Sequence, residues 1–405
     1  MPYCVPYWSP STYRAILRCV VAGAASEGRD VARLANRIAR LLGLPGVVPC
    51  GSGRAAIELA LRALGLREGT EVVVPTFCCA SVIPPILAIG AVPRLADVGE
   101  ELNLVPSTVE PVLSERTRAV IVPHLFGNPA EIEAIVELCR GRGIAVIDDA
   151  AQALGATLGG RPLGSFGDAG IVSFGNGKVC FGTGGGVLVS SRPEIREAAR
   201  QVLLARGTAA EGIRNALAVL VWRRWRRWSL PAWRVLSRVR GLKTERRPYR
   251  RSAMRNVDAA VAVTLLETLA FNVRARRERA ALYQELLRGA PGVRVIPHRE
   301  GSACLTQVIA LDPDGTAGTT VPGVIGALRA GGVEVNASYT PLHLLPEFQQ
   351  FGGRELDHAA RVWSRLVELP CEPSVQLDDV RRVTMIVRQV VTGSRDAATV
   401  GRGGS

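Results

Sequence analysis

The chain has 405 residues, of which 47% are hydrophobic and 21% are charged. This balance is that of an ordinary globular protein, so it argues against intrinsic disorder, and the length predicts two domains rather than one. The 50 Lys and Arg outnumber the 36 Asp and Glu, which gives a net charge of +14. Between residues 211 and 251 there are 13 basic and 2 acidic residues, so this one segment carries +11.

The cysteines, histidines and apolar runs exclude several classes of protein. Nine cysteines with irregular spacing and no CxxC pair argue against a disulfide framework or a zinc site, and they favour a reducing compartment. The four histidines lie far apart, so no metal site is expected. Arg18 interrupts the apolar stretch near the N-terminus, and no run of about 18 apolar residues occurs, so neither a signal peptide nor a transmembrane helix is predicted. The expected location is the cytoplasm.

Helix and strand patterns alternate along the first half of the chain. Apolar residues at 31, 34, 38, 41 and 42 have helical spacing. After Gly69, short apolar runs alternate with amphipathic segments, and this βαβ rhythm predicts a mostly parallel sheet with helices on both faces. The predicted strands are 71–75, 91–97, 119–124, 144–147, 171–174 and 185–189, and the predicted helices are 31–42, 55–64, 80–89 and 129–142.

A turn of small residues, Gly51-Ser52-Gly53, leads into the helix that is predicted to begin at Ala55. Free backbone N–H groups at a helix start lie at the positive end of the helix dipole and suit a phosphate, and Arg54 adds a cation there. A plain strand-to-helix turn has the same pattern, so the turn alone does not establish a phosphate site.

The stretch from Ile144 to Ser190 holds the strongest chemical signal. Its first apolar run ends in two carboxylates, Asp148 and Asp149, and ligands of open α/β sheets bind at the carboxyl ends of such strands. Lys178 is the only lysine of the stretch and lies among glycines. A lysine amine forms Schiff bases and an arginine does not, so the stretch predicts a pyridoxal phosphate site. The alternatives are a solvated loop lysine and two helix-capping aspartates.

The second half of the chain predicts a smaller domain. A long helix is expected over 259–287, followed by short strands and by helices at 320–331 and 356–366. The predicted organisation is a large cofactor-binding domain over 1–206, a basic insertion over 207–251, an interface helix with a small C-terminal α/β domain over 252–392, and a disordered tail over 393–405.

The basic insertion interleaves arginines with four of the chain's six tryptophans, at positions 222, 225, 228 and 233. Basic side chains meet anionic head groups and indoles favour the membrane interface, so peripheral membrane contact through Trp222–Arg240 is the favoured reading. A solvated amphipathic helix is the second reading. Nucleic-acid binding is the third and is not expected, although arginines and aromatics also grip single strands.

Several motifs in the same order resemble the sugar aminotransferases of the DegT/DnrJ/StrS type. The resemblance covers roughly residues 28 to 390 apart from the insertion, and its most specific part is Asp149-Ala150-Ala151-Gln152 followed by Ser173-Phe174 and Lys178. The other matching pieces are Gly51-Ser52-Gly53-Arg54-Ala55-Ala56, Pro75-Thr76-Phe77, Asp97, Pro123-His124-Leu125-Phe126-Gly127, Gly167-Asp168, Gly184-Gly185-Gly186, Pro341-Leu342-His343 and Leu369-Pro370.

The resemblance implies a homodimer with the aspartate-aminotransferase-like pyridoxal phosphate fold, and a set of residue roles. Lys178 would form the Schiff base with the cofactor and shuttle the proton. Asp149 would pair with the pyridine nitrogen, and Gln152 would lie near the phenolic oxygen. The phosphate would be held by Ser173, Gly53 and Arg54, the cofactor ring would be covered from position Cys79, and the substrate would be contacted by Tyr339 and His343.

The implied reaction is transfer of an amino group, from L-glutamate, onto a keto-sugar that is linked to a nucleotide, in the synthesis of surface polysaccharide or glycosylated metabolites. Family members that dehydrate sugars carry histidine in place of the lysine, so Lys178 favours transamination. Two other possibilities stay open on the sequence alone. One is a different pyridoxal phosphate reaction such as elimination, and the other is a non-catalytic protein that associates with membrane or nucleic acid.

This sequence departs from the family pattern at three places. Arg54 stands where threonine or serine is usual, and Arg250 and Arg251 stand near the place of an asparagine that reaches the phosphate from the partner subunit. Cys79 replaces the aromatic residue that stacks on the cofactor ring. Phe77, two residues earlier, is the candidate substitute, and Cys78 and Cys79 are expected to be buried packing thiols.

Overall fold

The structure is a computed structural model that describes residues 5–220, 249–312, 315, 318–353 and 356–393. Its largest feature is a seven-stranded sheet with the order β1-β9-β8-β5-β4-β2-β3, in which β9 alone runs against the other strands. The strands are β1 Val47–Cys50, β2 Glu71–Pro75, β3 Val92–Ala96, β4 Thr117–Pro123, β5 Ala145–Asp149, β8 Ala169–Ser173 and β9 Gly186–Val189. This sheet confirms the predicted fold class and each of the six predicted strands.

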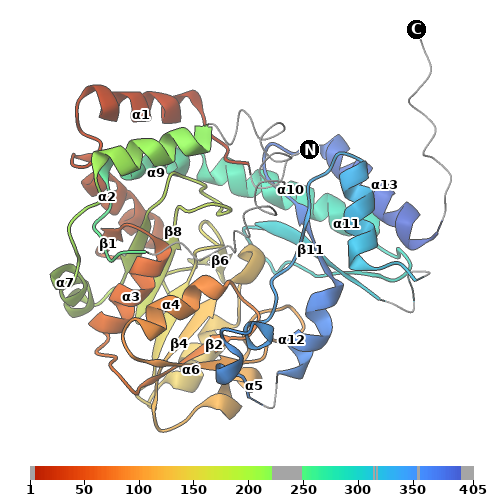
Figure 1. The fold of residues 1–405 in the computed structure, drawn as a ribbon, viewed down its shortest axis with the longest axis horizontal. Helices are drawn as coiled ribbons and strands as arrows, with labels where there is room; N and C mark the ends of the chain where they lie inside the picture. Colours follow the sequence, from red (N-terminus) through yellow and green to blue (C-terminus); the bar gives the residue numbers. More distant parts are fainter. Residues whose placement is uncertain (1–4, 221–248, 313–314, 316–317, 354–355, 394–405) are drawn as a thin grey trace.

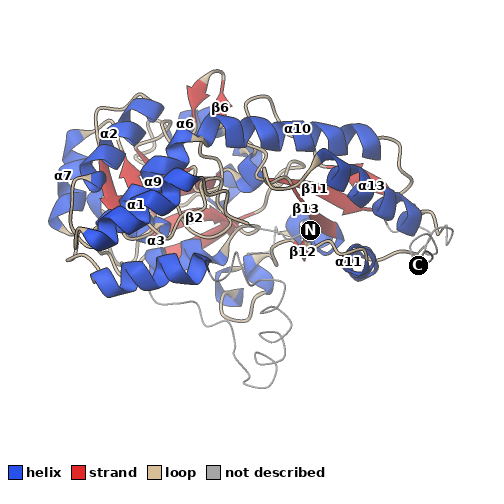
Figure 2. Cartoon of the chain, turned by 90° about the horizontal axis from the view of Figure 1, so that it is seen from above, coloured by secondary structure: helices blue, strands red, loops and turns tan. Residues whose placement is uncertain are grey.

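Helices cover both faces of this sheet, as Figures 1 and 2 show. Alternate residues of a strand point to opposite faces, and here both sets are apolar. In β2, Val72 and Val74 pack into the core that contains α3 and α4, whereas Val73 packs into the core that contains α2, α6 and α9. The helices of this part are α1 Pro10–Val21, α2 Asp30–Leu42, α3 Gly53–Ala63, α4 Ile83–Leu87, α5 Pro106–Val109, α6 Ile132–Cys139, α7 Pro193–Gln201 and α9 Asn256–Glu267.

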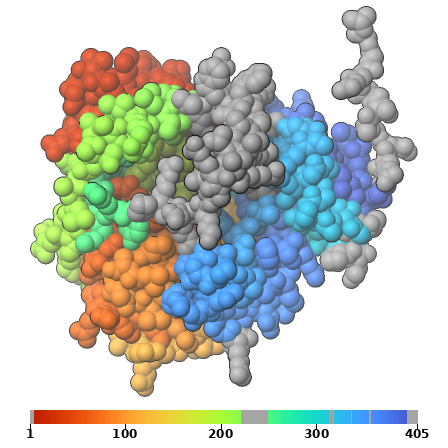
Figure 3. Space-filling view, in the orientation of Figure 1, coloured from red at the N-terminus to blue at the C-terminus, as the bar shows by residue number. Residues whose placement is uncertain are grey.

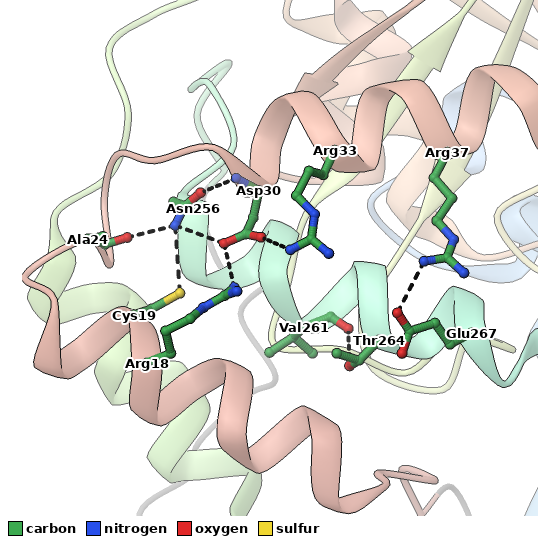
Figure 4. A network of polar contacts seen from close by, with 10 residues as sticks. All are labelled: Arg18, Cys19, Ala24, Asp30, Arg33, Arg37, Asn256, Val261, Thr264 and Glu267. Carbon is green, nitrogen blue, oxygen red and sulfur yellow. Dashed lines mark hydrogen bonds and ion pairs between the residues drawn. The ribbon is translucent and has the colours of Figure 1, made fainter.

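A buried polar network fastens the N-terminal helices α1 and α2 to α9 (Figure 4). The carboxylate of Asp30, at the start of α2, accepts hydrogen bonds from Arg18 and Arg33 at 2.7 Å each. Asn256 accepts from the backbone N–H of Asp30 at 2.8 Å and donates to the carbonyl oxygen of Ala24 at 2.8 Å. Since Asp30 and Asn256 are both buried, these bonds hold the helices in one arrangement.

The long helix predicted over 259–287 is wrong in one respect, because it is two helices. Helix α9 ends at Glu267, and α10 runs over Leu269–Leu287 at an angle of 59°. At the break, Thr268 has φ −104° and its hydroxyl donates to the carbonyl oxygen of Leu265 at 3.2 Å. Such back-bonding competes with the helical hydrogen bond and bends helices. Helix α10 extends from the large sheet to the small one (Figures 1 and 2).

The C-terminal part is built on an antiparallel sheet with the order β10-β11-β13-β12. The predicted helix 320–331 is confirmed, whereas the helix predicted over 356–366 ends early because Leu366 begins β13. The elements are β10 Val293–Val295, β11 Thr306–Leu311, α11 Val321–Ala330, β12 Asn336–Ala337, α12 Asp357–Val362, β13 Leu366–Pro370 and α13 Leu377–Val391. A smaller α/β unit after the large sheet was predicted, and it is present.

The two parts pack directly on each other, and in Figure 3 residues near 340–370 lie against the part of the chain near 50–100. The carboxylate of Asp97, after β3, accepts from the backbone N–H groups of His358 and Ala359 at 2.8 and 2.9 Å and so caps α12. The backbone N–H of Leu342 donates to the carbonyl oxygen of Thr76 at 2.6 Å. Hydrogen bonds to the backbone therefore join the two parts at these places.

The exact domain boundaries stay a prediction. Most of the basic insertion, residues 221–248, and all but one residue of the predicted tail lie outside the described residues. In the described part of the chain, all eight cysteines are free. No single helix there has both the length and the apolar content to cross a membrane, and α9 with α10 meets that test only as a bent pair.

His298 is bonded to the start of β11 and to the segment before it, and it makes the stability of the protein sensitive to acid. Its Nε2 lies 3.1 Å from the carbonyl oxygen of Thr306, and its Nδ1 lies 3.0 Å from the hydroxyl of Ser302. Burial lowers the pKa of His298 to about 4, and the bond to Thr306 opposes this effect. The unfolded histidine gains its proton near pH 6.5, so stability is lost as the pH falls from there towards 4.

We therefore expect the wild type to lose about 2–3 kcal/mol more than His298→Gln between pH 7 and pH 4. Glutamine still donates to Thr306 but does not titrate. Urea unfolding at both pH values measures the difference. Equal losses in the two proteins would show that His298 does not cause the acid sensitivity.

Candidate active site

A cavity of about 620 Å³ lies at the carboxyl ends of β4, β5 and β8 and takes side chains from both parts of the chain. This volume is in the range of small-molecule sites. Of the nine site residues predicted from the sequence, all except His343 line it. The eight predicted residues that line the cavity are Gly53, Arg54, Cys79, Asp149, Gln152, Ser173, Lys178 and Tyr339.

The neighbouring carboxylates at the end of β5 face opposite sides of the sheet. Asp149 lines the cavity and is only 5% exposed. Its Oδ1 accepts from the backbone N–H of Ala151 at 2.9 Å. Burial raises the pKa of Asp149, while the charge of Lys178 and the Ala151 bond act in the opposite direction. Asp149 is thus a buried carboxylate in the electric field of a lysine, in contact with the cavity.

Asp148 has a different environment and is fully buried. Its Oδ1 lies 2.7 Å from His124 Nε2, and its Oδ2 accepts from the backbone N–H groups of Gly164 and Phe166 at 2.7 and 2.9 Å. His124 Nδ1 accepts from the N–H of Ala130, so the ring hydrogen is on Nε2 and is donated to Asp148. Asp148 therefore fixes the ring of His124 and the loop that contains Gly164 and Phe166. Neither Asp148 nor Asp149 caps a regular helix with its side chain.

The start of α3 and the end of β8 lie side by side and both line the cavity. Ser52 caps the helix, accepting from the N–H of Ala55 at 3.1 Å. A Cβ atom on Gly53 would lie 3.1 Å from both Cβ and Oγ of Ser173, so a side chain at this position would crowd Ser173. Glycine here lets the two elements approach closely and places the positive end of the α3 dipole at the cavity, where it suits an anion.

Two distant side chains fix the loop that carries Lys178. Asn272 of α10 donates to the carbonyl oxygen of Val179 at 2.9 Å, and the indole of Trp8 donates to that of Phe181 at 2.8 Å. Both bonds are buried. The sequence reasoning missed both donors, because each is remote along the chain and has no motif of its own.

We expect Asn272→Leu to loosen the Lys178 loop. The change leaves the buried carbonyl of Val179 without its donor, which costs about 1–3 kcal/mol of folding stability. It should also speed amide hydrogen exchange in residues 178–183, which mass spectrometry measures peptide by peptide. The exposed Arg274→Leu on the same helix is the control. An exchange rate in the loop that matches this control would contradict the role of Asn272.

The residues around the expected ring-stacking position are arranged differently from the prediction. Cys79 is only partly buried and lines the cavity, so the expectation of a buried packing thiol holds for Cys78 and is wrong for Cys79. Phe77 is fully buried and lies outside the cavity lining, so it does not take the place of the missing aromatic residue. It packs instead against Phe126 and Tyr339, with ring centroids 6.2 Å from each.

Phe126 and Tyr339 bring aromatic rings to the cavity wall, stacked at 6.3 Å with an interplanar angle of 26°. Phe126 has φ +58°, a strained backbone conformation for a residue with a side chain. Its N–H donates to Gln152 Oε1 at 3.0 Å, and Gln152 Nε2 lies 3.3 Å from the Tyr339 hydroxyl. Gln152 therefore ties the large part of the chain to the small part across the cavity.

His343 is not among the residues that line the cavity, and its Nδ1 lies 2.6 Å from the hydroxyl of Thr76. Burial lowers the pKa of His343, opposed by the charges of Asp97 and Asp357. Its contact with substrate stays a prediction. The structure also adds lining residues that the sequence reasoning missed, namely Arg276, Glu368 and Glu372. Glu368 carried a usable signal, because it is a lone carboxylate within the apolar strand β13.

These features fit pyridoxal phosphate: a helix start at the cavity for the phosphate, a buried carboxylate in the cavity for the ring nitrogen, and a lysine on a fixed loop. Together with the seven-stranded sheet, they define the class as an α/β enzyme with the aspartate-aminotransferase-like fold. Over residues 10–388 the chain matches the DegT/DnrJ/EryC1/StrS aminotransferase family, and it belongs to that family.

Similar proteins extend over nearly the whole chain. The spore coat polysaccharide biosynthesis protein SpsC of Bacillus subtilis is 28% identical, covering 97% of this chain and 98% of that protein. The GDP-perosamine synthase of Vibrio cholerae is 27% identical, covering 91% and 93%. The crystal structure of the aminotransferase TlmJ from Streptoalloteichus hindustanus has a TM-score of 0.78 at 26% identity, covering 97% and 99%. The predicted family, cofactor and enzyme class are confirmed: the chain is a pyridoxal-phosphate-dependent sugar aminotransferase.

Proposed function

We propose that the enzyme transfers an amino group from L-glutamate to a keto-sugar linked to a nucleotide, in the synthesis of surface polysaccharide or another glycoconjugate. The observation that carries this proposal is the meeting of Lys178, Asp149 and the start of α3 at one cavity. The similarity to a GDP-perosamine synthase and to a spore coat polysaccharide protein supports the sugar class and the pathway. Elimination and non-catalytic roles are not favoured by these relatives.

Lys178 is proposed to supply the amine that would hold the cofactor aldehyde and, once released, would move the proton at the reacting carbon. When bound, pyridoxal phosphate supplies a conjugated ring that accepts electrons from that carbon. Asp149 is proposed to keep the ring nitrogen protonated. A buried carboxylate ionises most readily beside a cation, and a protonated nitrogen would supply that cation. The Lys178 loop, held by Trp8 and Asn272, would keep the amine in place between turnovers.

The phosphate is proposed to lie against Gly53, Arg54 and Ser173, at the positive end of α3. Tyr339 and Glu368, from the C-terminal part of the chain, also line the cavity, and their hydroxyl and carboxylate groups suit the hydroxyl groups of a sugar.

The test is a panel of nucleotide-linked keto-sugars incubated with glutamate labelled with ¹⁵N at its amino group. We expect one class of acceptor to gain the label, as mass spectrometry of the sugar product shows. Loss of water from the sugar without incorporation of label would instead support elimination. If wild-type protein took up no cofactor and labelled no sugar, the proposal would be wrong.

We also propose that the enzyme is a homodimer. Helix α1 presents an exposed apolar stripe at one-turn spacing, formed by Tyr13, Leu17, Val20 and Val21. Apolar side chains gathered on one helix face are typical of an interface. Sedimentation equilibrium at assay concentrations should give twice the chain mass, and a monomer that is fully active would contradict the proposal.

Peripheral membrane contact of a cytoplasmic enzyme through Trp222–Arg240 is a further proposal. It rests on composition, because residues 221–248 lie outside the described residues. Co-sedimentation with vesicles that contain anionic lipid should fall when residues 222–240 are deleted. Unchanged sedimentation would remove the proposal, and binding of single-stranded nucleic acid instead would favour the other reading.

A further inference from the structure

We propose that Tyr249 is a positioning residue that holds the guanidinium of Arg54 against the cofactor phosphate. The proposal rests on the function proposed above, in which the start of α3 binds that phosphate. It assigns a part of the phosphate site to the last residues of the basic insertion, next to the point where the chain rejoins the fold.

The first observation is the contact between Arg54 and Tyr249. The guanidinium carbon of Arg54 lies 5.1 Å from the centroid of the Tyr249 ring. Arg54 also lines the cavity in the first turn of α3. A planar guanidinium stacked on an aromatic ring is attracted by the electrons of the ring and loses much of its freedom to rotate. The Tyr249 ring is therefore a platform under the cation.

The second observation is that the platform is fixed. The Tyr249 hydroxyl donates to Glu58 Oε2 at 2.8 Å. Glu58 lies four residues after Arg54 on α3, and its Oε1 lies 2.9 Å from the Nε atoms of both Arg62 and Arg251. Only 6% of the Glu58 side chain is exposed. Three donors hold this buried carboxylate in place, and the carboxylate in turn holds the hydroxyl of Tyr249 and so restrains its ring.

The third observation places this segment beside the phosphate turn. The backbone N–H of Gly51 donates to the carbonyl oxygen of Ser252 at 2.8 Å, and Arg251 donates to the carbonyl oxygen of Val202 at 2.9 Å. Tyr249 is thus anchored next to the turn that precedes α3. Arginine at position 54 has a long stem that would lose much conformational freedom on binding an anion, and stacking it in advance lowers that loss.

The test compares cofactor binding with and without the phosphate. The full chain, freed of cofactor, is titrated with pyridoxal phosphate and with pyridoxal, which lacks the phosphate. We expect Tyr249→Leu to weaken binding of pyridoxal phosphate by about tenfold and to leave the affinity for pyridoxal within about twofold. Tyr249→Phe keeps the ring and should lose much less.

A double-mutant cycle tests whether Tyr249 acts through Arg54. If it does, Arg54→Ala combined with Tyr249→Leu should bind pyridoxal phosphate no more weakly than Arg54→Ala alone. Equal weakening of both ligands by Tyr249→Leu, no weakening at all, or full additivity in the cycle would each overturn the proposal. Failure of the proposed function looks different, because the wild type itself would then take up no pyridoxal phosphate.

Discussion

Lys178→Ala should abolish the visible absorption band of the cofactor-loaded enzyme and lower the rate of amino transfer by about 10⁴-fold. The change removes the amine proposed to form the Schiff base and to move the proton, and no arginine near the cavity replaces it. The fold should persist, because the loop is held through the carbonyl oxygens of Val179 and Phe181 rather than through the lysine side chain. Urea unfolding of the variant should therefore resemble that of the wild type.

The composition of the chain allows an unusually direct check. It contains only two lysines, Lys178 and Lys243. Reducing the loaded enzyme with borohydride converts a Schiff base into a stable amine, and peptide mapping then locates the label. We expect the label at Lys178, with Lys243 as the internal control. Lys178→Arg keeps a positive charge without a reactive amine, so it should fail like the alanine variant. Label at Lys243, or full activity of Lys178→Arg, would refute the assignment.

Local patterns in the sequence were sufficient for most of the fold. The apolar runs of the large sheet identify its strands, because strands buried on both faces are continuously apolar. The break at Thr268 was not predictable in the same way. Apolar spacing continues across it, and only the hydrogen bond from its hydroxyl to Leu265 shows why the helix ends.

The candidate site was predictable where chemistry and position coincide within a few residues. A carboxylate at a strand end and a lone lysine in a glycine loop are local signals, and both residues line the cavity. The supports of the site are not local. Trp8 and Phe181 are 173 residues apart, and Tyr249 and Glu58 are 191 apart. The two residues of each pair meet only in the complete fold, so these contacts could not be predicted from one sequence.

The two aspartates at the end of β5 should separate function from stability when each is replaced. Asp149→Ala is expected to lower the rate of amino transfer by about 10³-fold, because the cofactor ring would lose the carboxylate proposed to keep its nitrogen protonated. Its stability should be unchanged or slightly higher. Burial raises the pKa of Asp149, which means that the folded protein holds the charged form at a cost, and alanine removes that cost.

Asp148→Ala is the matched control, one residue away and on the other face of the sheet. It leaves the ring N–H of His124 and the backbone N–H groups of Gly164 and Phe166 without their acceptor in a fully buried site. Breaking such a buried cluster costs about 3–5 kcal/mol. Urea unfolding and steady-state kinetics on both variants give the comparison. A stable but inactive Asp148→Ala, with an unstable but active Asp149→Ala, would reverse the assignment of the two carboxylates.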